Sequence, residues 1–184
     1  MKVCGIDLAG NPKNKTGICI LVNLTARTFI VYQNHEIINL IKKEKPKLIA
    51  IDAPLSMPKN GKLRSAEIQL RKIGIRAYPP LIKSMESLTK RGILLKKKLE
   101  KIGFRVLETY PGGAQDILKI PRKKNKDGLI NGLKNLGIKF DKKITHHELD
   151  AITAAYVARL ELLGKTSKFG NKKEGEIVLP KVSN

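Results

Sequence analysis

The fold is indicated by two short stretches, KVCGID at residues 2–7 and KLIAID at residues 47–52. Each is a run of mostly apolar residues that ends in an aspartate, a pattern typical of a buried strand. Residues 16–22 and 27–32 are strand-like as well, and the short polar break between them predicts a hairpin. We therefore expect residues 2–32 to form a meander of three antiparallel strands.

The second aspartate-ended stretch follows a segment with helical period. Residues 35–45 place isoleucine and leucine on one side and mostly lysine on the other, with Asn34 as the expected N-cap and Pro46 as the stop. A strand, a crossover helix and a further strand favour parallel pairing. The stretch at residues 47–52 is therefore predicted to lie parallel to the first strand.

The rest of the chain predicts one more buried strand and several helices. The strand is expected at residues 104–109, and residues 176–180 are either a short edge strand or a docking segment after a basic polar segment at 164–175. This order predicts an α/β fold with a mixed sheet, in a single domain over residues 1–184. The further helices are expected at about 65–73, 83–102, 128–136 and 146–163.

The composition indicates the kind of partner. Lysine and arginine number 37 and aspartate and glutamate 16, which gives a net charge of +21 over 184 residues. So positive a surface attracts nucleic acid, although genome bias or a hot habitat also produces lysine-rich chains. The 41% of apolar residues excludes a disordered polycation. With no tryptophan, four tyrosines and four phenylalanines, a platform that stacks successive bases is not expected.

The cysteines and the apolar segments bear on the compartment. Cys4 and Cys19 lie in apolar runs without a Cys-x-x-Cys motif, so they predict core residues of a reduced, cytoplasmic protein and no zinc site. No run approaches the ~18 apolar residues of a membrane span. The first strand begins at residue 2, which leaves no room for a signal peptide. We predict a cytoplasmic protein without a membrane partner.

The acidic residues mark a candidate site. Asp7 and Asp52 end buried strands, where open α/β sheets place their ligands. Asp150 lies in the last predicted helix, with His147 one turn earlier on the same side, and Glu108 lies near the end of the third strand. Several carboxylates in one crevice repel each other unless protons or cations intervene, and Mg²⁺ or Mn²⁺ suits oxygen ligands. In the last helix, tight packing on the sheet is expected from a stripe of small residues, Ala151, Ala154, Ala155 and Ala158.

Structural interpretations of the same residues stay open. An aspartate at a strand end also serves as a turn or cap residue, and His147 is equally well a surface residue of the first helical turn. Glu148 stands three residues after Thr145, the spacing of a capping box, and is left out of the site. The Tyr110-Pro111 pair is also explained by the turn after its strand.

Taken in order, five motifs resemble one protein family. They are GIDLA at 5–9, IDAPL at 51–55, ETYP at 108–111, HELDA at 147–151 and GEIVLP at 175–180. The set resembles the DUF429 family, whose members are predicted nucleases of the RNase H-like superfamily. The resemblance implies a five-stranded mixed sheet, with three antiparallel strands followed by parallel ones and helices on both faces.

The resemblance also implies roles for the site residues. Asp7, Asp52 and Asp150 would be the metal-binding acids of an RNase H-like nuclease, and His147 matches the residue that resolvase-type members use one turn before the last acid. Glu108 has no counterpart in the three-acid scheme, and it would be a supporting group or a further ligand.

These inferences lead to a functional hypothesis of metal-dependent hydrolysis of phosphodiester bonds in DNA or RNA. Two Mg²⁺ or Mn²⁺ ions would be bridged by Asp7 and held by Asp52 and Asp150, and Glu108 or His147 would orient the attacking water. A homodimer is expected if the substrate is a branched junction. The cations expected to contact phosphates are Lys13, Lys15, Lys59, Lys62, Arg64, Arg122, Lys123 and Lys124.

Two other functions fit the same sequence. The protein could be a nucleic-acid-binding module without catalysis, which absence of Mg²⁺ or Mn²⁺ binding would favour. A nucleotide-binding protein is the third possibility, since sugar-kinase and actin-like ATPases resemble this fold. Those proteins use two copies of the fold, whereas 184 residues supply one, and no GxxxxGK[ST] motif is present.

Overall fold

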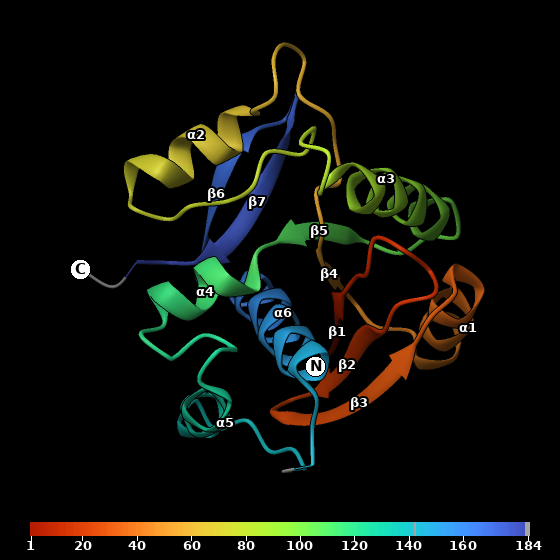
Figure 1. The fold of residues 1–184 in the computed structure, drawn as a ribbon. Helices are drawn as coiled ribbons and strands as arrows, with labels where there is room; N and C mark the ends of the chain where they lie inside the picture. The colour runs from red at the N-terminus through yellow and green to blue at the C-terminus, as the bar shows by residue number, and fades with distance from the viewer. Residues whose placement is uncertain (142, 183–184) are drawn as a thin grey trace.

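Seven strands form one mixed sheet in the computed structural model, which describes residues 1–141 and 143–182 (Figure 1). Their spatial order is β3-β2-β1-β4-β5-β7-β6. The β1, β2 and β3 strands form an antiparallel meander, β4, β5 and β7 run parallel to β1, and β6 pairs antiparallel at the edge. The strands are β1 (Lys2–Asp7), β2 (Thr16–Val22), β3 (Thr25–Val31), β4 (Ile49–Asp52), β5 (Val106–Thr109), β6 (Thr166–Asn171) and β7 (Gly175–Pro180).

Helices cover both faces of this sheet. The long α6 helix packs on one face together with α5, and α1 and α3 pack on the other, as Figure 1 shows. The α2 and α4 helices pack around β7 at the β6 end of the sheet. The helices are α1 (Asn34–Glu44), α2 (Ser65–Lys72), α3 (Glu86–Lys101), α4 (Pro111–Ile117), α5 (Lys126–Asn135) and α6 (His146–Leu162).

The α6 helix lies very close to the sheet because small residues face each other across the contact. A Cβ atom at Gly5 of β1 would lie 2.1 Å from the carbonyl oxygen of Ala151 and 2.2 Å from the amide nitrogen of Ala155. The α6 stripe is fully buried, as expected from its composition: Ala151, Ala154, Ala155 and Ala158. This close contact fixes the start of α6 over the end of β1.

The expected meander and the parallel fourth strand are confirmed, but the count of five strands is wrong. Residues 164–175, expected as a basic polar segment, contain the β6 strand, and β7 lies inside the sheet between β5 and β6 instead of at its edge. The β6 strand is polar and half-exposed, so it lacks the apolar run by which strands were recognised. Its antiparallel pairing with the adjacent β7 strand forms it.

Two helix starts also differ from expectation. The α4 helix begins at Pro111, where only the turn after the strand was expected. Proline is tolerated at the first helical position because its missing N–H has no helical partner there. The N-cap of α1 is Gln33 instead of Asn34, and its capping box is completed by Glu36.

The remaining expectations concern the cysteines and the membrane. Cys4 and Cys19 are free thiols in the core, and burial raises the pKa of Cys4 well above its ordinary value. Within residues 1–141 and 143–182, none of the helices is both long and apolar enough to cross a bilayer.

Candidate active site

Three aspartates from distant parts of the chain line one cavity of about 500 Å³. Asp7 and Asp52 are direct neighbours in the parallel register of β1 and β4, so both side chains leave the same face at the carboxyl ends of the strands. Asp150, in the first turns of α6, reaches the cavity from the helix that covers this face. The predicted convergence of the strand acids with the helix acid is thus present in the structure.

The carboxylates perturb one another because they are held together away from water. Burial, together with the negative charges of Asp7 and Asp150, raises the pKa of Asp52 well above its ordinary value. The pKa of Asp150 is also raised, chiefly by burial and further by Asp7, although the Lys123 ammonium opposes this. The cavity therefore concentrates negative charge that only a proton or a cation can relieve.

His147 lies directly against the first of these acids. Its Nδ1 atom is 2.7 Å from Oδ2 of Asp7, and 46% of its side chain is exposed. The hydrogen bond with Asp7 raises the pKa of His147 above its ordinary value. His147 is therefore a polar group of the site that both contacts an acid and reaches solvent.

Asp150 is held by two side chains from the segment around α4. Gln115 Nε2 donates to Oδ1 at 2.9 Å, and Lys123 Nζ donates to Oδ2 at 3.1 Å. The Lys123 side chain is 58% exposed, so its ammonium reaches the acid from the cavity mouth. Gln115 was not predicted as a site residue, because α4 was not expected and a lone glutamine carries no motif.

Glu108 also lines this cavity, but it reaches it from the other face of the sheet. It pairs in register with Ile51, the neighbour of Asp52, so its side chain leaves the opposite face of the sheet. One carboxylate oxygen accepts from the Leu55 backbone N–H at 2.8 Å, and both oxygens accept from Arg64, at 2.6 and 2.8 Å. These hydrogen bonds favour a structural role for Glu108 over the predicted role of orienting an attacking water, which stays a prediction.

Arg64 is the buried partner of that carboxylate. Its side chain is fully buried between Glu67 and Glu108, and it also donates to Ser56 Oγ at 2.8 Å. Burial opposes its charge, but the two carboxylates outweigh this effect and raise its pKa. Arg64 lines the cavity of the aspartates, as its predicted place at the rim of the site requires, but its side chain is fully buried and paired with two carboxylates, so the predicted contact with phosphates does not fit.

The other predicted cations fall into three groups. Arg122, Lys123 and Lys124 line the cavity of the aspartates. Lys13 and Lys15 line a separate open hollow of about 630 Å³ that includes His147. The two groups therefore lie on either side of the Asp7–His147 pair.

Lys59 and Lys62 form the third group. Both are exposed on the loop between β4 and α2, and neither lines the cavity of the aspartates. The backbone N–H of Lys59 donates to Glu174 at 3.0 Å, which ties this loop to the β6–β7 turn.

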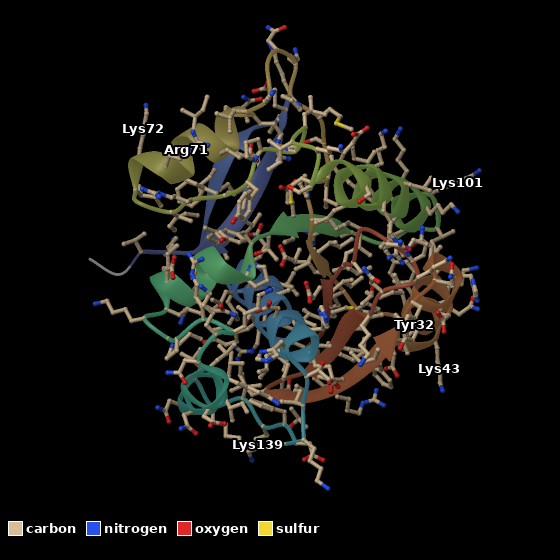
Figure 2. All side chains as sticks on the ribbon, in the orientation of Figure 1. Tyr32, Lys43, Arg71, Lys72, Lys101 and Lys139 are labelled. Carbon is tan, nitrogen blue, oxygen red and sulfur yellow. The ribbon has the colours of Figure 1, made fainter. Side chains whose placement is uncertain are left out.

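Much of the positive charge lies far from the acids. Figure 2 shows cations from several elements at the outer edge of the view, pointing into solvent: Lys43, Arg71, Lys72, Lys101 and Lys139. The spread of positive charge over the surface therefore does not by itself mark the acidic cavity as the place where nucleic acid binds.

The cavity fits a divalent cation by the chemistry of its donors. Asp7, Asp52 and Asp150 offer hard oxygen ligands, and their mutual repulsion is the kind that Mg²⁺ or Mn²⁺ relieves. The geometry is not that of a finished metal cage: among the described residues, no three His, Cys, Asp or Glu side chains are grouped closely enough to hold an ion. In this arrangement the Lys123 ammonium supplies the positive charge at Asp150.

Comparison with solved structures finds this fold in RuvC of Thermus thermophilus. The structure of Thermus thermophilus RuvC is 14% identical to the chain at a TM-score of 0.52, with 89% of this chain and 97% of RuvC covered. For T. thermophilus RuvC in complex with Holliday junction substrate, the identity is 14% and the TM-score 0.54, with 89% and 96% covered. No protein-family model and no curated protein sequence matches the chain.

These likenesses establish the class of fold. The chain has a mixed α/β fold of the RNase H-like class, and the particular structures that share it include RuvC of T. thermophilus. At 14% identity they show the fold alone. The resemblance to the DUF429 family stays a prediction, since no family model supports it.

Proposed function

We propose that the protein is a metal-dependent nuclease of the RNase H-like superfamily that hydrolyses phosphodiester bonds. The observation that carries this proposal is the convergence of Asp7, Asp52 and Asp150 on one cavity at the carboxyl ends of β1 and β4. The likeness to RuvC supports it, because the same fold there belongs to a protein solved with a Holliday junction. Branched DNA is therefore the first substrate to test.

The three aspartates would hold the metal. Mg²⁺ or Mn²⁺ bound there would neutralise the phosphate charge and lower the pKa of a bound water. His147 positions Asp7 through their hydrogen bond and, being half-exposed, can exchange a proton between the site and solvent. Lys123 neutralises Asp150 in the absence of metal and is free to turn toward a phosphate when a metal replaces it.

The two groups of cations beside the acids would hold the polyanion. Lys13 and Lys15 lie in the hollow on the His147 side, and Arg122, Lys123 and Lys124 lie on the cavity side. A nucleic-acid strand that contacts both groups would pass the Asp7–His147 pair, which joins the two hollows. For a junction substrate, a homodimer would present two such sites. A cytoplasmic location of the protein agrees with its two free thiols.

The test is cleavage of single-stranded, duplex, RNA–DNA hybrid and four-way-junction substrates with Mg²⁺ or Mn²⁺. Asp7→Asn and Asp52→Asn are expected to lower the rate at least about 100-fold, because each removes a charged metal ligand. Asp127→Asn is the matched control, since Asp127 is exposed in the first turn of α5 and is expected to leave the rate unchanged. Cleavage that survives Asp7→Asn would falsify the proposal.

A second candidate is a nucleic-acid-binding protein without catalysis. The observation that favours it is the ion pair of Lys123 with Asp150, which satisfies one acid without metal. Calorimetry separates the two candidates: the nuclease binds Mn²⁺ and loses this binding in Asp52→Asn, whereas the binding protein takes up no Mn²⁺ and still binds DNA.

A further inference from the structure

The cavity of the aspartates has an apolar side that the proposed hydrolysis does not use. Besides the acids it is lined by side chains from the segment before α3, from α3 itself and from the N-cap of α4. These are Ala77, Tyr78, Met85, Leu88 and Tyr110. A site that bound only metal and phosphate would gain nothing from such a wall.

One tyrosine of this wall is fixed by its neighbours. The ring of Tyr110 packs on the first turn of α4, where a Cβ atom at Gly113 would lie 2.8 Å from its Cδ1 atom. The Arg122 guanidinium lies 5.8 Å from the ring centroid, and its Nη1 donates to the phenolic oxygen at 3.3 Å. Arg122 is held in turn by Asp116, whose carboxylate accepts from its Nε at 2.8 Å.

The other tyrosine of this wall, Tyr78, is largely exposed to solvent. Tyr78 lies between α2 and α3, and 68% of the residue is exposed, the largest value among the exposed large apolar residues of the described chain. A large ring left in water beside a cavity is available to a ligand. Two of the four tyrosines of the protein thus line one cavity, one held by its neighbours and one largely exposed.

We propose that this wall is a subsite for one unpaired nucleobase of the substrate, next to the bond that is hydrolysed. The proposal rests on the proposed function. A base offers a flat apolar face that stacks on tyrosine, and a volume of about 500 Å³ is enough for one nucleotide. The base would enter between Tyr78 and Tyr110, while Lys123 and Lys124 at the same cavity contact its phosphates.

The proposal predicts the substrate class. Bases in an intact duplex are stacked on their neighbours and cannot enter a pocket, so the target nucleotide has to be unpaired or extruded. Two tyrosines suffice for a single base, in agreement with a composition too poor in aromatic residues to stack a series of them. The preferred substrate therefore carries an unpaired nucleotide at a bulge, a junction or a single-stranded segment.

The experiment compares two DNA duplexes that differ in one base. Each carries a single bulged nucleotide, which is adenine in one and an abasic site in the other, so the backbone is the same. Dissociation constants are measured with Mg²⁺ in the Asp7→Asn background, with Tyr78 intact, changed to Ala or changed to Phe. Tyr32→Ala is the matched control, because Tyr32 is an exposed tyrosine of the separate Lys13 hollow.

The Asp7→Asn protein that retains Tyr78 is expected to bind the adenine bulge about tenfold more tightly than the abasic one. This difference is in the range of the affinity gained by stacking one base on one tyrosine. Tyr78→Ala reduces this preference to less than twofold, whereas Tyr78→Phe and Tyr32→Ala retain it. Equal affinity for the two duplexes, or a preference that survives Tyr78→Ala, overturns the subsite.

Cleavage by the wild-type protein distinguishes this result from failure of the nuclease itself. If no substrate is cut but the Tyr78-dependent preference is present, the subsite stands and hydrolysis fails. If both duplexes are cut at the same rate and bound equally, hydrolysis stands and the subsite is refuted. A preference lost equally in Tyr32→Ala also refutes it, because the effect would not come from this wall.

Discussion

Replacing Glu108 with glutamine separates a structural role of this acid from a catalytic one. In the structure the carboxylate accepts one backbone and two guanidinium hydrogen bonds, and Arg64 keeps Glu67 as a second buried partner. The guanidinium therefore remains compensated in Glu108→Gln, and the loss is that of one or two charge-assisted hydrogen bonds at about 1.5–3 kcal/mol each. We expect the free energy of unfolding to fall by about 2–3 kcal/mol.

Arg64→Met should cost more, because it leaves two buried carboxylates without their partner. Breaking a buried ion pair in this way costs about 3–5 kcal/mol. Since Arg64 and Glu108 share one set of contacts, the double variant should lose less stability than the two single variants added together. Glu100→Gln is the control, because its surface pair with Lys96 at 3.9 Å is expected to contribute less than about 1 kcal/mol.

The assay is urea unfolding followed by circular dichroism, with cleavage rates measured where each variant is folded. Glu108→Gln is expected to lower the unfolding midpoint while its cleavage rate stays within about threefold of wild type, because its carboxylate is engaged by Arg64 and the Leu55 backbone. A variant of unchanged stability whose rate falls 100-fold would refute this reasoning, since it would make Glu108 a catalytic residue.

Three further predictions follow from the packing and the charges. Gly5→Ala places a methyl group against the α6 backbone, so the free energy of unfolding should fall by about 3 kcal/mol or more, which thermal unfolding would show as a lower melting temperature. Lys13→Ala should reduce the slope of log affinity for DNA against log salt by about one, whereas Lys139→Ala, exposed far from the acids, should leave it unchanged. Burial opposes the charge of Glu44, but hydrogen bonds from Arg27 and Lys2 outweigh it and lower its pKa. The stabilisation that the Glu44 carboxylate provides is therefore present at neutral pH and lost as pH falls through that pKa. Glu44→Gln should have a lower free energy of unfolding than wild type at pH 7, and the two values should converge in acid unfolding titrations.

The sequence predicts the part of the site whose residues lie in recognisable local patterns. Asp7 and Asp52 each end an apolar run, and adjacent parallel strands bring such ends together. The small residues of α6 indicated a helix packed tightly on the sheet, which determines where Asp150 and His147 lie. These inferences needed only side-chain period and strand polarity.

The parts that were missed depend on pairing partners that the local sequence does not indicate. The β6 strand is polar, and it becomes a strand because β7 pairs with it. Arg64 looked like a loop cation because nothing in its neighbourhood shows that Glu108, 44 residues away, is its partner. Gln115 contacts Asp150 across 35 residues and belongs to no recognisable motif. Such contacts are properties of the folded chain.

A crystal structure of the protein with Mn²⁺ shows directly whether the three aspartates form a metal site. We expect an anomalous-scattering peak between Asp7, Asp52 and Asp150, with Lys123 moved away from Asp150, and loss of the peak in Asp52→Asn. A structure that retains the Lys123–Asp150 ion pair, with no peak in this cavity at a saturating Mn²⁺ concentration, would contradict it.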